Sequence, residues 1–230
     1  MNTLFTFGCS YTADFESNEI GNYVKYKEYR GGTYPKSWPT LLSEKMGMDI
    51  KNYGIGGAGN QSIFEQFCIH SDEIKENDIV IIGWSFVHRY RWARIDSDNW
   101  FYVGAGPITD INLGQDNETH EKIIHNRTND VYVDEVFNYI KLIDVFSESK
   151  KFKVFYWFSD ERLTKKLNEN TLNKKSFILW KNDLLRTIYS KGAKNIHEET
   201  NGKIEDTHLG ELGHQIQSNI IYEHIQQKII

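Results

Sequence analysis

Two short polar motifs near opposite ends of the chain contain the residue types of a nucleophile and its base. Ser10 closes the motif Gly8-Cys9-Ser10, and Asp206 lies two residues before His208. A serine hydroxyl is a weak nucleophile at neutral pH and needs a general base within hydrogen-bond reach. Histidine serves best when a carboxylate fixes its tautomer and stabilises the imidazolium. These residues predict acyl transfer, with Ser10 attacking, His208 moving the proton and Asp206 orienting the imidazole.

A glycine-rich stretch supplies candidate donors for the oxyanion that such a reaction develops. The stretch from Gly54 to Asn60 follows a predicted strand and opens a predicted helix. Glycine lets a substrate approach the backbone closely, and the N–H groups at a helix N-terminus attract negative charge. The backbone N–H groups of Gly57 and of Ser10 itself are therefore the expected oxyanion donors.

Each of these motifs directly follows the end of a predicted strand. Short apolar runs at 4–7, 50–53, 78–83, 153–158 and 194–196 alternate with helical patterns, which is typical of a parallel sheet built from β-α-β units. The carboxyl ends of parallel strands meet at one edge of a sheet, where ligands bind. The segments 8–10, 54–60, 83–85 and 206–208 should gather there. We expect a single α/β domain over residues 1–230, with a five-stranded parallel sheet between two helical layers.

Several helices can be expected from apolar spacing and capping residues. Ser37 has the features of an N-cap, and Pro39 then stands in the first turn of a helix. Further helices are expected to bury residues 63–68, 133–143, 177–188 and 212–225. The tyrosine-rich segment up to Pro35 is expected to be a loop. Residues 86–130 lose all periodicity and are expected to form an inserted region.

The order of the motifs resembles that of the SGNH (GDSL-like) hydrolase superfamily. The motif ending at Ser10 stands where that family has its nucleophile block, the segment 52–57 resembles the block whose glycine donates to the oxyanion, and the segment 206–208 resembles the block of acid and base. The resemblance implies a flavodoxin-like α/β/α fold and hydrolysis of esters, often acyl or acetyl groups on glycans or lipids. No cofactor and no metal is implied.

The chain departs from the family pattern in two places. The third block normally reads Gly-x-Asn-Asp, with the asparagine as an oxyanion donor, but Ser85 stands in its place here. Either the Ser85 hydroxyl or the Asn60 side chain, at the next helix start, could substitute. The last block usually spaces its acid three residues before the histidine, and that position is Glu205. Glu205 therefore competes with Asp206 as the orienting acid.

Substrate contacts are expected from the residues just after the third strand. Arg89 could pair with an anionic group, and Trp84 or Trp92 could stack on a sugar. The other interpretation of the segment 88–94 is an exposed helix of the inserted region.

Other interpretations of the motifs stay open at this point. Cys9 could be the nucleophile, although neighbouring residues of a strand point in opposite directions. The pattern Gly54-x-Gly56-x-x-Gly59 formally matches a dinucleotide fingerprint. His214, on the last predicted helix, is expected to be a packing or surface residue. A non-catalytic glycan-binding or interaction module on a degenerate hydrolase fold is the alternative to an enzyme.

Bulk composition excludes several classes of protein. The chain has 230 residues and a net charge of −5, with no basic stripe to offset it, which argues against nucleic-acid binding. The two cysteines show no pairing or zinc-binding pattern, and no apolar run approaches the roughly 20 residues of a membrane helix. We expect a cytoplasmic protein that acts on a small-molecule or glycan ester, without a nucleic-acid or membrane partner. The sequence does not indicate an oligomeric state.

Overall fold

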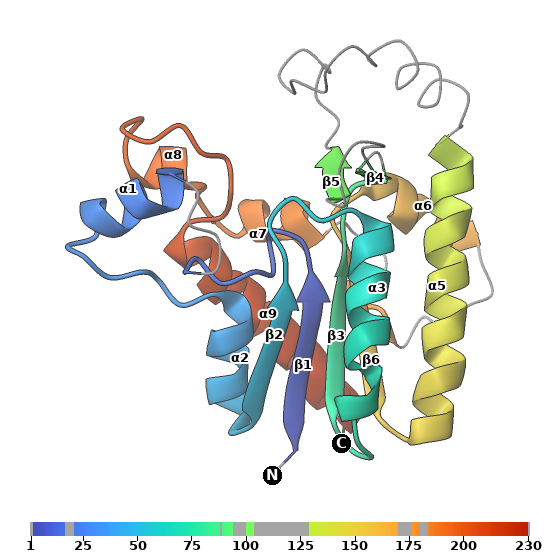
Figure 1. Cartoon of the computed structure of the whole chain (residues 1–230). Coiled ribbons are helices and arrows are strands. Elements are labelled where there is room, and N and C mark those ends of the chain that lie inside the picture. Colours follow the sequence, from blue (N-terminus) through green and yellow to red (C-terminus); the bar gives the residue numbers. More distant parts are fainter. Residues whose placement is uncertain are drawn as a thin grey trace.

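A parallel β-sheet lies at the centre of the protein (Figure 1). The structure is a computed structural model that describes residues 2–16, 21–87, 89–93, 100–103, 129–169, 176–179 and 184–229. Within these ranges the sheet has four strands in the order β2-β1-β3-β6. The strands are β1 (Thr3–Gly8), β2 (Asp49–Gly54), β3 (Ile79–Trp84) and β6 (Lys153–Phe158). The α/β class and the parallel sheet therefore agree with the prediction.

The two central strands are apolar because both of their faces are covered. Every residue of β3 is buried, and so is every residue of β1 after Thr3. In β1 the side chains alternate between two cores, with Phe5 and Phe7 in one and Leu4 in the other. A continuous apolar run is the pattern of a parallel strand that has helices on both sides.

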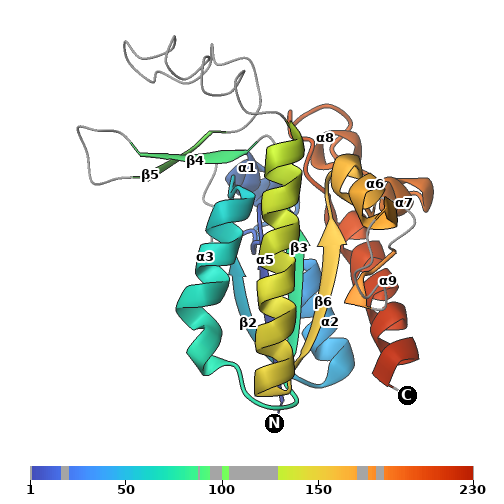
Figure 2. The ribbon, with the colours of Figure 1, turned by 90° about the vertical axis from the view of Figure 1, so that its right-hand side faces the viewer.

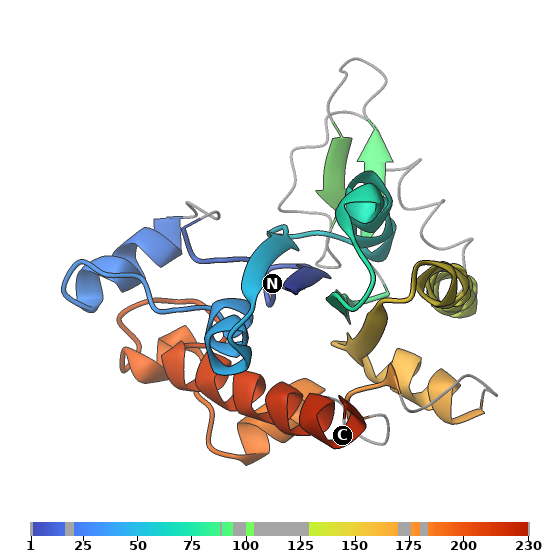
Figure 3. The ribbon, with the colours of Figure 1, turned by 90° about the horizontal axis from the view of Figure 1, so that it is seen from below.

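Helices pack on both faces of the sheet (Figures 2 and 3). The helices α3 (Asn60–His70) and α5 (Asn129–Lys150) cover one face, and α2 (Trp38–Met46) and α9 (Glu211–Ile229) cover the other. Each pair contributes to its own apolar core, with Phe67 and Ile140 in the first core and Leu42 and Ile221 in the second. The expected N-cap residue Ser37 does precede α2, but its hydroxyl donates to Asp14 instead of capping the helix.

Four further helices and a 3₁₀ turn belong to the described part of the chain. They are α1 (Gly21–Tyr29), η1 (Ser71–Glu73), α6 (Glu161–Glu169), α7 (Leu184–Ser190) and α8 (Ile196–Glu199). The helix α1 lies in the tyrosine-rich segment that was expected to be a loop. The helix α6 lies in a charged segment after β6, where no helix was predicted. In the predicted helix 177–188, only the part from Leu184 is helical among the described residues, while Phe177 forms a single bridge to Tyr156 of β6.

The prediction of a fifth strand at Lys194–Ile196 is wrong. Ile196 opens α8, and Asn195 is the N-cap of that helix. The Asn195 side chain accepts a hydrogen bond from the Glu198 N–H at 2.8 Å, and the Glu198 carboxylate accepts one from the Asn195 N–H at 3.0 Å. This reciprocal capping box starts a helix where apolar content had indicated a strand.

Two antiparallel strands follow the third strand of the sheet. They are β4 (Tyr90–Ala93) and β5 (Trp100–Val103), and Tyr90 pairs with Val103. The described part of the segment 88–94 is thus a strand, so its interpretation as an exposed helix is wrong. His88 and the residues 94–99 and 104–128 of the expected inserted region lie outside the described residues.

No helix within the described ranges is both long enough and apolar enough to cross a membrane.

Candidate active site

A tight turn after β1 contains Ser10, and the residue before it, Cys9, lies in the core. The N–H groups of Thr12 and Ala13 both donate to the Cys9 carbonyl, at 2.8 and 3.0 Å, so the chain reverses direction at Ser10. A side chain at Gly8 would overlap the Thr12 hydroxyl, which explains the glycine before the turn. Cys9 is fully buried in the core, whereas Ser10 keeps 5% of its surface exposed. The turn therefore presents the hydroxyl of Ser10 and not the thiol of Cys9.

Ser10, His208 and Asp206 form one hydrogen-bonded chain. The Oγ of Ser10 lies 2.9 Å from the Nε2 of His208, and the Nδ1 of His208 lies 2.7 Å from the Oδ1 of Asp206. A carboxylate can only accept, so Nδ1 carries the imidazole proton and Nε2 is left to accept from the Ser10 hydroxyl. The same Oδ1 also accepts from the backbone N–H of His208 at 2.8 Å, which fixes the acid relative to the base.

The competing acid, Glu205, does not take this position. Its side chain is exposed, and its backbone carbonyl accepts from the Asn22 amide at 3.0 Å. Burial alone would raise the pKa of the Asp206 carboxyl, but hydrogen bonds from His208 and Asn22 outweigh burial and lower the pKa below its ordinary value. Asp206 is therefore held as a carboxylate against His208.

The segment that was predicted as a strand positions the acid and the base. The N–H of Ile196 donates to the His208 carbonyl at 2.9 Å, and the N–H of His197 donates to the Asp206 carbonyl at 2.9 Å. The N–H of Gly210 in turn donates to the Lys194 carbonyl at 3.0 Å. The start of α8 thus pairs with the Asp206 loop over a short distance, without joining the central sheet.

Aromatic side chains enclose the His208 imidazole. The ring centroids of Tyr11 and Tyr23 lie 5.3 and 5.7 Å from that of His208. Burial, with smaller electrostatic contributions from nearby groups, raises the pKa of both tyrosine hydroxyls, so the enclosure is uncharged at neutral pH. Tyr23 belongs to α1, the helix that the sequence pattern did not predict, and no spacing signal indicated that it would approach His208.

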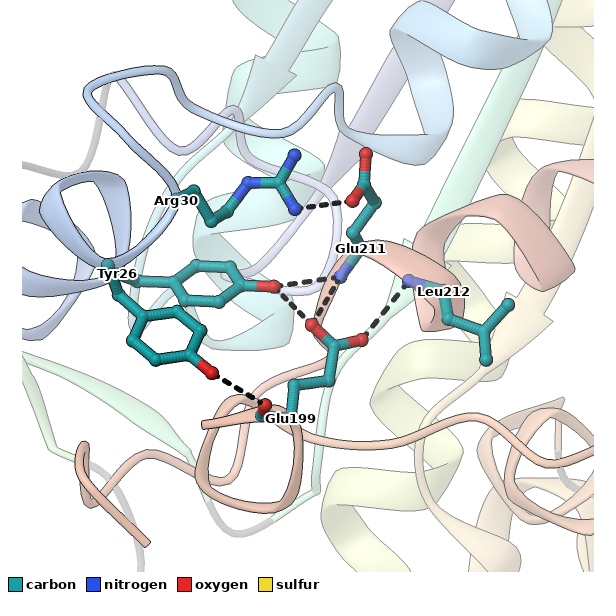
Figure 4. A network of polar contacts seen from close by, with 6 residues as sticks. Tyr26, Arg30, Glu199, Glu211 and Leu212 are labelled. Atoms are coloured by element: carbon teal, nitrogen blue, oxygen red, sulfur yellow. Dashed lines mark hydrogen bonds and ion pairs between the residues drawn. The ribbon is translucent and has the colours of Figure 1, made fainter. Parts of the chain in front are cut away.

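A polar network joins α1 to the two helices that flank the Asp206 loop (Figure 4). The Glu199 carboxylate accepts from the N–H groups of Glu211 and Leu212, each at 3.2 Å, and so caps the N-terminus of α9. The Tyr26 hydroxyl donates to the same carboxylate and accepts from the Glu211 N–H at 3.2 Å. Arg30 forms an ion pair with Glu211. These contacts hold α1 in place beside His208.

Asn60 and Ser85, the two candidates for the missing oxyanion donor, are bonded to each other. The Oδ1 of Asn60 accepts from the Ser85 N–H at 2.7 Å, and its Nδ2 donates to the Ser85 carbonyl at 3.2 Å. Ser85 is 0% exposed, and its Oγ accepts from the Arg89 guanidinium at 3.2 Å. The Ser85 hydroxyl is therefore buried and accepts a hydrogen bond from Arg89, and its expected role as an oxyanion donor stays a prediction. Asn60 is 6% exposed and keeps a second amide hydrogen.

The glycine-rich loop lies beside the Ser10 turn. The N–H of Ile55 donates to the carbonyl of Gly8 at 2.9 Å. Gly57 has φ +75°, and a Cβ added there would meet no atom within 4 Å, so its backbone borders open space. This conformation favours glycine and leaves room for a ligand.

Two glycines of the dinucleotide-like pattern are explained by packing within the chain. A Cβ on Gly54 would lie 2.5 Å from the backbone nitrogen of Ala13, and a Cβ on Gly59 would lie 2.5 Å from the carbonyl oxygen of Arg89. These close approaches between backbone segments account for both glycines, and a pyrophosphate is not needed to explain them.

The expected contact between Trp84 and a sugar is contradicted by its burial. Trp84 is fully buried in the core, and its ring stacks on Tyr139 with centroids 6.2 Å apart. As a residue of β3 it contributes to the layer between the sheet and α5. Arg89, by contrast, is partly exposed next to Ser85. The Trp92 side chain lies outside the part of the chain that the structure describes.

Comparison with known proteins finds similarity only at the level of structure. No protein-family model and no curated protein matches the sequence. A structure assigned to the lipolytic G-D-S-L family from Desulfitobacterium hafniense is 10% identical, with a TM-score of 0.48, over 97% of this chain and 99% of the other. A member of the lipolytic G-D-S-L family from Veillonella parvula is 12% identical, with a TM-score of 0.46, over 97% of each chain. The chain thus has structural matches to G-D-S-L family proteins over nearly its full length.

Proposed function

We propose that the protein is a serine ester hydrolase that works through a covalent acyl-enzyme. The observation that carries the proposal is the hydrogen-bonded chain from the Ser10 hydroxyl through His208 to the Asp206 carboxylate. A buried acid behind a histidine, with a serine within reach of the other ring nitrogen, is the arrangement that converts a hydroxyl into a nucleophile.

The reaction would proceed in two halves. In the first, the Oγ of Ser10 bonds to the ester carbonyl carbon while Nε2 of His208 takes its proton. The bond to the leaving alcohol then breaks, and His208 gives that proton to the alcohol oxygen. In the second half a water attacks the acyl-enzyme, again through His208, and releases the acid and the free Ser10 hydroxyl. Asp206 stays ionised and stabilises the imidazolium in both halves.

Three donors are proposed for the oxyanion. The backbone N–H groups of Ser10 and Gly57 are two of them, since the loop of Gly57 is hydrogen-bonded to the end of β1 and borders open space. The second amide hydrogen of Asn60 is the third, because the first is used by the Ser85 carbonyl. The bidentate contact with Ser85 holds the Asn60 amide in one orientation and so prepares it for the transition state.

The proposed substrates are esters of small molecules or glycans, including O-acyl and O-acetyl sugars. No cofactor takes part in the proposed steps.

The test is covalent labelling of the purified protein with a fluorophosphonate, together with turnover of activated short-chain esters. We expect labelling and turnover in the wild type and in Cys9→Ala, and neither in Ser10→Ala. Thermal unfolding should verify that each variant is folded. A folded wild type that ignores both the probe and the esters would contradict the proposal and would favour a non-catalytic glycan-binding module.

A further inference from the structure

Arg89 is a partly exposed cation held in a defined position after β3. Its Nη1 donates to the Ser85 Oγ at 3.2 Å, and its guanidinium lies over the Phe86 ring, 5.1 Å from the centroid. The backbone of Arg89 is also fixed, because Gly59 lies against its carbonyl so closely that a Cβ there would approach the oxygen to 2.5 Å. Contacts with the start of α3 and with the residues just after β3 therefore both hold Arg89 in place.

A continuous row of side chains connects Arg89 to the catalytic base. The ring of Phe86 contacts that of Tyr11, with centroids 6.4 Å apart, and the ring of Tyr11 lies 5.3 Å from that of His208. Arg89 is near enough to the Tyr11 hydroxyl for its charge to oppose the rise in the Tyr11 pKa that burial causes. Arg89 thus borders the same site as Ser10 and His208.

The guanidinium has no carboxylate partner among the described residues. Its contacts there are a neutral hydroxyl and an aromatic face. A guanidinium has five N–H donors, and one of them is used by Ser85. A bound carboxylate, phosphate or sulfate would give the guanidinium the charge-assisted partner that the described residues do not supply. The remaining donors have the fork geometry that binds these groups.

We propose that the ester substrate carries an anionic group, and that Arg89, held by Ser85, binds that group. This inference rests on the proposed hydrolase function and defines its substrate class. The phenyl ring of Phe86 and the Ser85 hydroxyl both contact the guanidinium and hold it in position. A charge-assisted hydrogen bond of this kind corresponds to a preference of about 10- to 100-fold in binding.

The test compares matched neutral and anionic esters. For an anion on the acyl group, the neutral ester is p-nitrophenyl butyrate and the anionic ester is p-nitrophenyl hemisuccinate. For an anion on the alcohol, the neutral ester is phenyl acetate and the anionic esters are acetoxybenzoate and acetoxyphenyl phosphate. We expect the wild type to prefer an anionic member of at least one pair by about 10- to 100-fold in kcat/KM, mainly through KM. Comparing acetoxybenzoate, which carries a carboxylate, with acetoxyphenyl phosphate then shows which anion the site favours.

Variants of Arg89 then separate recognition from catalysis. Arg89→Gln should remove the preference, measured as the ratio of kcat/KM for the anionic ester over its neutral partner, and Arg89→Lys should restore part of that ratio. Labelling of Ser10 verifies that the nucleophile still reacts in both variants. Lys151→Gln is the matched control, because it removes one exposed cation between α5 and β6, at the opposite edge of the sheet, and should keep the full preference. A wild type that turns over esters without preferring any anion, or a preference that survives Arg89→Gln, would overturn the inference. A wild type inactive on every ester contradicts the hydrolase proposal instead.

Discussion

Ser10 and His208 are 198 positions apart in the chain, yet the Oγ of one lies 2.9 Å from the Nε2 of the other. One residue follows the first strand of the sheet, and the other lies in the loop before the last helix. The contact forms only when β1 is at the centre of the sheet and the Asp206 loop is paired with the start of α8. The candidate site is therefore a product of the whole fold and not of a local motif.

The first prediction separates the two candidate acids. Asp206→Asn should lower kcat by about 10³- to 10⁴-fold, because an amide can donate to Nδ1 and so favours the tautomer that cannot accept the Ser10 proton. Glu205→Gln should leave kcat unchanged, since the Glu205 side chain is exposed and the contact of this residue with Asn22 is made by its backbone carbonyl. Steady-state hydrolysis of an activated ester measures both. Equal losses in the two variants would contradict the assignment of Asp206.

The second prediction concerns the oxyanion. Asn60→Ala and Asn60→Asp should each lower kcat by about 10²- to 10³-fold with little change in KM, because both remove the amide donor. The aspartate variant keeps an acceptor for the Ser85 N–H, so it distinguishes loss of the donor from loss of the contact with Ser85.

Gln61→Ala is the matched control for Asn60, since it removes the neighbouring amide, which donates to Glu135. Its kcat should equal that of the wild type. A wild-type kcat in Asn60→Asp would mean that the third donor lies elsewhere.

The sequence allowed most of the central sheet to be predicted because three of its four described strands, β1, β3 and β6, are largely apolar. β3 and β6 each bury nearly every residue, and a segment covered on both faces has one simple pattern. The positions of Ser10, Asp206 and His208 after strands or before a helix were likewise visible. The predicted strand at 194–196 was wrong because the side chains of Asn195 and Glu198 form a capping box, a reciprocal contact that outweighs local apolar content.

The surroundings of the site could not be predicted, because they depend on contacts between distant segments. Nothing in the tyrosine-rich stretch indicates that Tyr26 bonds to Glu199, 173 positions later, and it is this network that brings α1 to His208. The burial of Trp84 depends on α5, which packs on the same face of the sheet. The pairing of the Asn60 amide with the backbone of Ser85 is also a tertiary contact, with no trace in local spacing.

The third prediction concerns Asn22, which we expect to position the acid. Its amide donates to the Glu205 carbonyl and contributes a hydrogen bond that lowers the pKa of Asp206. Asn22→Ala should lower kcat about 10-fold, by roughly the 1.4 kcal/mol that one such bond is worth. Because the pKa of Asp206 should rise when the donor is lost, the steeper part of the acid limb of the kcat/KM profile, where Asp206 also becomes protonated, should begin at a higher pH.

Two further variants define the role of Asn22. Asn22→Asp should move the acid limb further, since a second carboxylate beside Asp206 opposes its ionisation. Lys25→Ala, at an exposed position of the same helix, is the control and should keep the wild-type profile. An unchanged profile in Asn22→Asp would contradict the positioning role.

The fourth prediction concerns His214, which the structure buries as a packing residue. Its Nδ1 accepts from the Trp38 N–H at 3.1 Å, and its ring packs on Phe15. Burial, with a smaller contribution from the charge of His208, lowers the pKa of His214 from 6.5 to about 3. The unfolded chain therefore binds a proton between these values that the folded chain does not, and stability that is complete above pH 6.5 is lost as the pH falls toward 3.

Urea unfolding at pH 7, 5.5 and 4.5, followed by tryptophan fluorescence, measures this loss. In His214→Gln, whose side-chain oxygen can still accept from Trp38, the free energy of unfolding should fall less steeply with acid, by up to about 1.4 kcal/mol per pH unit. His197→Gln, at an exposed histidine, is the matched control and should follow the wild type. Since the carboxylates are common to all three proteins, their contribution cancels in the comparison. An identical acid dependence in His214→Gln and the wild type would mean that His214 is protonated in the folded state, and the hydrogen bond from Trp38 could not then persist.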